Sequence, residues 1–205
     1  MIESGLTVDF IGGAVGHRRR FGGGRGQALP KALGFRPGVT PRIVDATAGL
    51  GRDAFLLASL GAEVTLIERS PNIHGLLEAG MARAAAENNE LADIIGRMTL
   101  LNGDARDILP TLEPETVLID PMHPPRGKSA LVKNEMRLLR DIVGTDPDCQ
   151  ELMVVALEAA AKRVVLKWPR RGDPMPEIEP ASHQILGKST RYDVFMRHSP
   201  APDQS

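Results

Sequence analysis

Four carboxylates stand at or just past the ends of apolar runs that the sequence predicts to be buried strands. They are Asp45, Glu68, Asp104 and Asp120. A charge beside buried backbone is costly unless it binds something, so four acids at equivalent positions indicate a shared site. Carboxylates accept hydrogen bonds from hydroxyl and amino groups and attract cations. The predicted chemistry is therefore the binding of a polar, positively charged ligand.

A glycine turn follows the first of these acids. Residues 45–55 read Asp-Ala-Thr-Ala-Gly-Leu-Gly-Arg-Asp-Ala-Phe, and Gly49 and Gly51 separate a predicted strand from a predicted helix. Such a turn lets backbone N–H groups approach a ligand. The spacing also fits the dinucleotide fingerprint G-x-G-x-x-A, so NAD is an alternative ligand. The carboxylates of Asp45 and Asp53 would repel a pyrophosphate, which favours the sulfonium and amino cations of S-adenosylmethionine.

Each acid has an expected role toward that ligand. Glu68 would accept the ribose hydroxyls, Asp104 would accept the adenine amino group, and Arg69 would lie beside the adenine. The stretch from Asp45 to Asp53 would form the cradle for the methionine portion. The sequence therefore predicts a methyl-donor site, with a dinucleotide site as the second choice.

A second motif, Asp120-Pro-Met-His123, follows the fourth predicted strand. The exocyclic amine of a nucleobase is a poor nucleophile because its lone pair is delocalised into the ring. A carboxylate from Asp120 and the backbone carbonyl of Pro121 can accept both N–H bonds and orient the lone pair, while His123 can stack on the base. The motif alone also permits DNA adenine or a protein glutamine as the methylated amine, and an isolated Asp-Pro pair is often a simple turn.

The elements that must position these residues alternate along the chain. Strands are predicted at 43–44, 63–68, 98–101, 116–120 and 162–167, and helices at 53–60, 71–88, 104–109, 130–143 and 150–161. A short helix at 27–33 precedes them, and strands at 183–188 and 191–197 form a closing hairpin. This order predicts an α/β, Rossmann-like fold with a mostly parallel sheet and an antiparallel C-terminal hairpin. Ligands of such sheets bind beyond the strand C-termini.

Length and composition exclude several classes. We expect 205 residues with 42% hydrophobic side chains to form a single domain over 1–205, with 1–42 as a basic, Gly/Arg-rich arm. A single cysteine, Cys149, excludes an internal disulfide framework. The sequence has neither an apolar run long enough to span a membrane nor a signal peptide, so we expect a cytoplasmic protein. No metal site is predicted.

The charge is unevenly distributed although the net charge is only −1. Residues 1–42 hold seven Lys/Arg against two acids, and residues 43–120 hold five against thirteen. Basic side chains in two segments are candidates for binding RNA phosphates: Arg18, Arg19, Arg20 and Arg25 in the arm, and Lys128, Lys133 and Arg137 after the second motif. Ordinary solvated basic faces and a frayed terminus are the alternatives.

Several of these stretches together resemble the RsmJ (YhiQ) family of bacterial ribosomal RNA guanine-N2 methyltransferases. They are residues 9–13, 17–26, 44–55, 120–122, 128–133 and 135–137, with 162–165 and 191–193. The resemblance implies methyl transfer from S-adenosylmethionine to N2 of one guanine in 16S rRNA, in the cytoplasm. It also implies cofactor contacts at Arg52, Asp53, Glu68, Arg69, Asp104, Ala105 and Asp120. Family members usually have an aromatic residue where this chain has His123.

Three alternatives stay open at this point. The first is a methyltransferase acting on another amine. The second is a non-catalytic RNA-binding assembly module that keeps the fold. The third is a dehydrogenase, which would bind a nicotinamide cofactor at the glycine turn.

Overall fold

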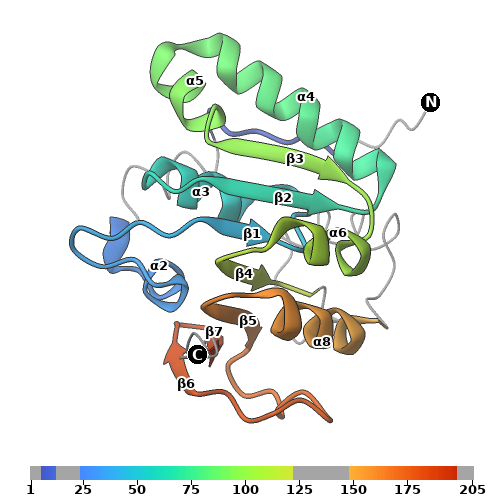
Figure 1. The fold of residues 1–205 in the computed structure, drawn as a ribbon. Coiled ribbons are helices and arrows are strands. Elements are labelled where there is room, and N and C mark those ends of the chain that lie inside the picture. The colour runs from blue at the N-terminus through green and yellow to red at the C-terminus, as the bar shows by residue number, and fades with distance from the viewer. Residues whose placement is uncertain (1–5, 13–23, 122–147, 198–205) are drawn as a thin grey trace, which may run out of the picture.

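The computed structural model describes residues 6–12, 24–121 and 148–197 (Figure 1). The helical elements are η1 (Gly24–Gly26), α2 (Ala28–Leu33), α3 (Arg52–Ser59), α4 (Pro71–Glu87), α5 (Asn89–Ile95), α6 (Ala105–Leu112) and α8 (Cys149–Ala159). The strands are β1 (Ile43–Asp45), β2 (Val64–Glu68), β3 (Met98–Asn102), β4 (Thr116–Ile119), β5 (Arg163–Pro169), β6 (His183–Leu186) and β7 (Thr190–Met196). The helix expected at 130–143 lies outside the described residues.

The strands of the described residues form one sheet in the order β3-β2-β1-β4-β5-β7-β6. The first five strands in this order are parallel to one another, whereas β7 runs antiparallel to both β5 and β6. The predicted fold class and the closing hairpin are therefore confirmed. Because β1 to β5 are parallel, their C-terminal ends meet at one edge of the sheet, which is where the predicted acids stand.

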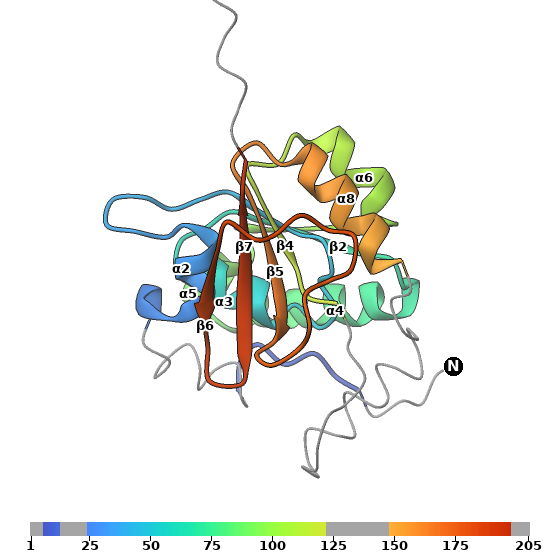
Figure 2. The same ribbon diagram turned by 90° about the horizontal axis from the view of Figure 1, so that it is seen from below.

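Helices cover both faces of the sheet (Figure 2). On one face α2, α3, α4 and α5 pack over an apolar cluster that includes Phe55, Leu66 and Leu77, all fully buried. On the other face α6 and α8 pack over a second cluster that includes Leu109 and Met153. Strands buried on both faces explain the continuous Val/Ile/Leu runs of the sequence. None of the helices in the part described here is long and apolar enough to cross a membrane.

One helix of the structure is not predicted from the sequence. The pattern predicts a helix from the Ser70-Pro71 start to about Asn88, which agrees with α4 ending at Glu87, but it does not predict α5, which begins at Asn89. Asn88 has extended backbone, and its side-chain Oδ1 accepts a hydrogen bond from the N–H of Leu91 at 2.9 Å. An asparagine that caps the next helix therefore also ends the previous one.

The helix predicted at 104–109 is longer in the structure, although it contains a proline. We expected that helix to close near Pro110, but α6 continues to Leu112 with the proline inside it. A proline within a helix costs about 3 kcal/mol. Leu109 is fully buried, and Ile108 and Leu112 pack against the second cluster. Each buried side chain contributes about 1.5–3 kcal/mol, so apolar packing outweighs the proline.

The N-terminal segment 6–12 is part of the core. Leu6, Val8 and Phe10 are buried, and the ring of Phe10 stacks on Phe55 with a centroid separation of 4.7 Å. Arg83 of α4 donates a hydrogen bond to the carbonyl of Val8 at 2.9 Å. A β-carbon at Gly80 would lie 2.6 Å from Val8, so the absence of a side chain there lets the segment lie against α4.

Candidate active site

The glycine turn lies across the ends of three strands. The N–H of Ala46 donates to Leu118 of β4 at 2.9 Å, and the N–H of Ala48 donates to Ile67 of β2 at 3.1 Å. Gly49 and Gly51 have φ values of 52° and 68°, in the left-handed region that favours glycine. Gly51 also touches the core, because a β-carbon there would lie 2.7 Å from Leu77. The turn is therefore fixed by both backbone conformation and packing.

Glu68 fixes the turn from the end of β2. Its side chain is only 6% exposed, and its two carboxylate oxygens each accept a backbone hydrogen bond. Oε2 accepts from the N–H of Gly49 at 2.9 Å, and Oε1 accepts from the N–H of Ser70 at 2.8 Å. The carboxylate is thus held in one orientation beside the glycine turn.

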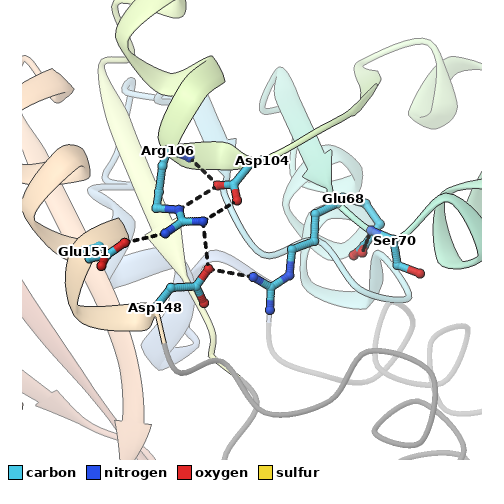
Figure 3. Close-up of polar contacts among 7 residues, drawn as sticks. Glu68, Ser70, Asp104, Arg106, Asp148 and Glu151 are labelled. Carbon is cyan, nitrogen blue, oxygen red and sulfur yellow. Dashed lines mark hydrogen bonds and ion pairs between the residues drawn. The ribbon is translucent and has the colours of Figure 1, made fainter.

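A network of ion pairs forms the rim beside α6 and α8 (Figure 3). Asp104 caps α6 and holds the guanidinium of Arg106, with Nη2 to Oδ2 at 2.8 Å. Asp148 forms ion pairs with both Arg106, at 3.1 Å, and Arg69, at 2.8 Å. Glu151 also pairs with Arg106. The hydrogen bond from Arg106 lowers the pKa of Asp104, which is therefore a carboxylate at neutral pH.

Three aspartates and one lysine meet at the ends of β1, β4 and β5. The ammonium of Lys167 lies 2.7 Å from Oδ2 of Asp53 and 2.5 Å from Oδ2 of Asp120. Burial opposes the charge on Lys167, but the two carboxylates outweigh burial and raise its pKa, so the lysine is a cation. Asp45 is fully buried behind them. Desolvation by burial, reinforced by the charges of Asp53 and Asp120, raises the pKa of Asp45 to about 7.

The backbone of the second motif is anchored by Thr47. Its hydroxyl oxygen accepts the N–H of Asp120 at 2.7 Å, and its own N–H donates to Asp45 at 3.2 Å. The turn after β1 and the motif after β4 are therefore joined by hydrogen bonds.

These elements enclose a pocket that we call the strand-end pocket. Its lining residues are Ala46, Thr47, Gly49, Ile67, Glu68, Arg69, Gly103, Asp104, Ala105, Arg106, Asp120, Pro121, Asp148, Cys149 and Leu152. Six of the predicted cofactor residues are among them: Gly49, Glu68, Arg69, Asp104, Ala105 and Asp120. Four others, Asp45, Gly51, Arg52 and Asp53, do not line it. Direct contact of those four with a ligand stays a prediction.

The structure also locates part of the predicted RNA-binding set. Arg25 donates hydrogen bonds to the hydroxyl of Thr40 at 2.8 Å and to the carbonyl of Leu60 at 2.9 Å, and its guanidinium lies over the ring of Phe35. This arginine thus ties η1 to the segment before β1 and to the end of α3. The other candidates lie outside the described residues: Arg18, Arg19, Arg20, His123, Lys128, Lys133 and Arg137.

Sequence reasoning missed Lys167, Arg106 and Asp148. Lys167 stands at the end of a predicted strand like the four acids, and this position is the signal that could have identified it. The other two depend on contacts between segments far apart in the chain, which no local pattern contains. Within residues 6–12, 24–121 and 148–197, the acids and histidines do not gather into a group that could hold a metal ion.

Known proteins resemble the chain over nearly its whole length. The model of a family described as putative SAM-dependent methyltransferase matches residues 2–197. Ribosomal RNA small subunit methyltransferase J of Brucella anthropi is 68% identical over 95% of each chain. The enzyme of the same name from Agrobacterium fabrum is 67% identical over 97% of this chain and 96% of that one. A crystal structure of a SAM-dependent methyltransferase from Neisseria gonorrhoeae, 32% identical, matches 98% of this chain and 78% of its own, with a TM-score of 0.73.

Proposed function

We propose that this chain, which belongs to the family of ribosomal RNA small subunit methyltransferase J, methylates N2 of a guanine in 16S rRNA. The family makes it an enzyme that takes its methyl group from S-adenosylmethionine. The single observation that carries the choice of an amine acceptor is the position of Asp120 and Pro121, which directly follow β4 and line the strand-end pocket. We further propose that the enzyme acts in the cytoplasm.

The charges of the strand-end pocket support a cationic donor. When bound, S-adenosylmethionine supplies an electrophilic methyl group on a sulfonium. Glu68 is positioned to accept the ribose hydroxyls, and Asp104 with Arg106 borders the place for the adenine. Both arginines of the rim already pair with carboxylates. Little positive charge is left for a pyrophosphate, which argues against a dinucleotide.

Asp120 and Pro121 would orient the acceptor amine. The carboxylate of Asp120 and the carbonyl of Pro121 can accept the two N2–H bonds, which turns the nitrogen lone pair toward the methyl group. Lys167 holds Oδ2 of Asp120 at 2.5 Å and thereby fixes the plane of that carboxylate. As the N–C bond forms, the C–S bond electrons leave with sulfur, and the surplus proton on N2 departs through the carboxylate to solvent.

Basic side chains would hold the RNA around this site. Six of them are proposed as phosphate contacts: Arg18, Arg19, Arg20, Lys128, Lys133 and Arg137. Arg25 is proposed as a further RNA contact, and His123 as a stacking partner of the base. The bonds of Arg25 to Thr40 and Leu60 give it a structural role as well.

Methylation of separated substrates tests the proposal. Ribosomal RNA from a strain lacking this protein is incubated with the enzyme and labelled S-adenosylmethionine, in parallel with DNA and bulk protein. We expect label only in RNA, and N2-methylguanosine at one position of 16S rRNA by mass mapping. Label in DNA or protein would favour another amine. RNA binding without any calorimetric affinity for the donor would favour a non-catalytic module.

Asp120→Asn tests the acceptor role. The change keeps shape but replaces one acceptor oxygen with a donor, so we expect the rate to fall by about 10²–10⁴-fold. Asp107→Asn on the exposed face of α6 is the matched control and should keep full activity. Full activity of Asp120→Asn would refute the role of Asp120.

A further inference from the structure

A second cavity also borders Asp120, and we call it the loop cavity. Its volume is about 560 Å³, within the usual range of ligand pockets. It is lined by Asp120, Lys167, Trp168, Pro169, the proline-rich loop after β5, and Ser189 and Thr190 before and at the start of β7. Asp120 is thus the residue that lines both cavities. A group that must present an acceptor amine to a donor has to face both ligands, and Asp120 does.

The walls of the loop cavity are tied together before any ligand arrives. The N–H of Arg170 donates to the carbonyl of Ser189 at 3.3 Å, and its guanidinium donates to the carbonyl of Gly187 at 2.9 Å. Arg191 of β7 donates to the carbonyl of Gly172 in the facing loop. These bonds join the loop after β5 to the turn between β6 and β7. A preformed cavity loses less conformational entropy on binding than a mobile one.

Trp168 gives this cavity an aromatic wall. It is the only tryptophan of the chain and the only aromatic residue lining the cavity within the described residues. Its indole Nε1 donates to the carbonyl of Asp173 at 2.7 Å, and its ring packs against the second apolar cluster. The ring is therefore held in one orientation. A fixed aromatic face beside the acceptor carboxylate is what a base needs for stacking.

The polar groups of the cavity suit a nucleotide. The ammonium of Lys167 and the hydroxyls of Ser189 and Thr190 can donate to the ring nitrogens and the carbonyl oxygen of guanine. Three exposed cations adjoin the lining residues in sequence: Arg170, Arg171 and Lys188. Cations at this position can contact the phosphates of the flanking nucleotides.

We propose that the loop cavity receives the target guanine, extruded from the RNA, with Trp168 as its stacking platform. The proposal rests on the proposed function, because it assumes that an RNA guanine is the acceptor. It adds the place of the base and a specificity-determining residue. Extrusion brings N2 to Asp120, while the donor lies in the strand-end pocket.

Two variants of Trp168 separate stacking from folding. Both Trp168→Phe and Trp168→Leu lose the hydrogen bond to Asp173, but only the phenylalanine keeps an aromatic ring. We expect Trp168→Leu to lower kcat/KM for rRNA by about 5- to 150-fold, and Trp168→Phe to restore most of that loss. Calorimetric affinity for the donor should stay within about threefold in both, which shows that the fold is intact. Equal activities of the two variants would overturn the proposal.

The single tryptophan also offers a readout without catalysis. An RNA fragment centred on the methylated guanine should quench the emission of Trp168, and the same fragment with an abasic site at that guanine should not. Equal quenching by both fragments would overturn the proposal. If wild-type protein methylates no RNA at all, the proposed function fails instead. If wild-type protein methylates RNA, but the two Trp168 variants are equally active and the two fragments quench equally, only the placement of the base fails.

Discussion

The strand-end pocket and the loop cavity share Asp120 but are built from different kinds of structure. The first is made from the ends of parallel strands and the glycine turn, joined by backbone hydrogen bonds. The second is made from a proline-rich loop and an antiparallel hairpin, joined by arginine side chains. The pocket for the shared donor thus depends on sheet geometry, whereas the cavity for the particular acceptor depends on loops. A fold can therefore keep its donor and change its acceptor by changing the loops.

Lys167 tests whether the two sites are independent, because it lines the loop cavity and contacts Asp120, which lines both sites. Lys167→Met leaves Asp53 and Asp120 without their cation beside buried Asp45. We expect methyl transfer to fall at least about a hundredfold, and stability to fall by about 3 kcal/mol in urea unfolding. Lys162→Met, which removes an exposed pair with Glu115 before β5, is the control and should have little effect. Activity near that of wild type would show that Asp120 needs no partner.

Asp45, which is buried near Asp53 and Asp120, tests how the protonation of a buried carboxyl affects stability. Its raised pKa means that the folded state holds a proton that the unfolded state releases between about pH 4 and pH 7. Stability should therefore fall as pH rises, by roughly 3 kcal/mol between pH 5 and pH 8. In Asp45→Asn, an uncharged mimic of the protonated acid, urea unfolding should lose most of this decline. Asp93→Asn on the exposed face of α5 should keep it. A wild-type stability that rises over this range would contradict the assignment.

Glu68 tests the strand-end pocket alone. Glu68→Gln replaces one acceptor oxygen with an amide that faces the N–H of Gly49 or Ser70. We expect the Kd for S-adenosylmethionine to rise by about 10- to 100-fold in calorimetry, while RNA affinity in a filter-binding assay stays unchanged. The control is Glu63→Gln, because Glu63 is exposed and lies just before the N-terminal end of β2. An equal loss of RNA affinity would mean that the two sites are coupled.

Arg106 tests the rim and should have the smallest effect. Its pairs with Asp104, Asp148 and Glu151 are partly exposed, and exposed ion pairs contribute about 0–1 kcal/mol. We expect Arg106→Gln to weaken donor binding by about two- to fivefold. Arg97→Gln, exposed before β3, should leave the donor Kd unchanged. A loss as large as that of Glu68→Gln would make the rim a principal donor contact.

The difference between the two sites also explains what the sequence could predict. The rule that parallel strand ends meet was enough to place Glu68, Asp104 and Asp120 on one pocket. Lys167 ends the predicted strand 162–167 but is not an acid, so the rule did not select it. Trp168 lies in the part of β5 beyond the predicted strand, which extends to Pro169 because Thr190 of β7 pairs with it. That pairing joins residues about twenty positions apart across a loop with no periodic pattern. The short helix α5, which Asn88 caps, was not predicted, and α6 continues past Pro110 because apolar packing there outweighs local preference.

The segment 6–12 has a consequence for synthesis on the ribosome. Its residues are made before α3 and α4, and Arg83, which holds Val8, is 75 positions further along the chain. Leu6, Val8 and Phe10 must wait unburied until α3 and α4 have left the exit tunnel. Closing so long a loop carries an entropic cost, so the burial of this segment is a non-local step of core formation. The segment 6–12 is therefore buried only after α4 has been made.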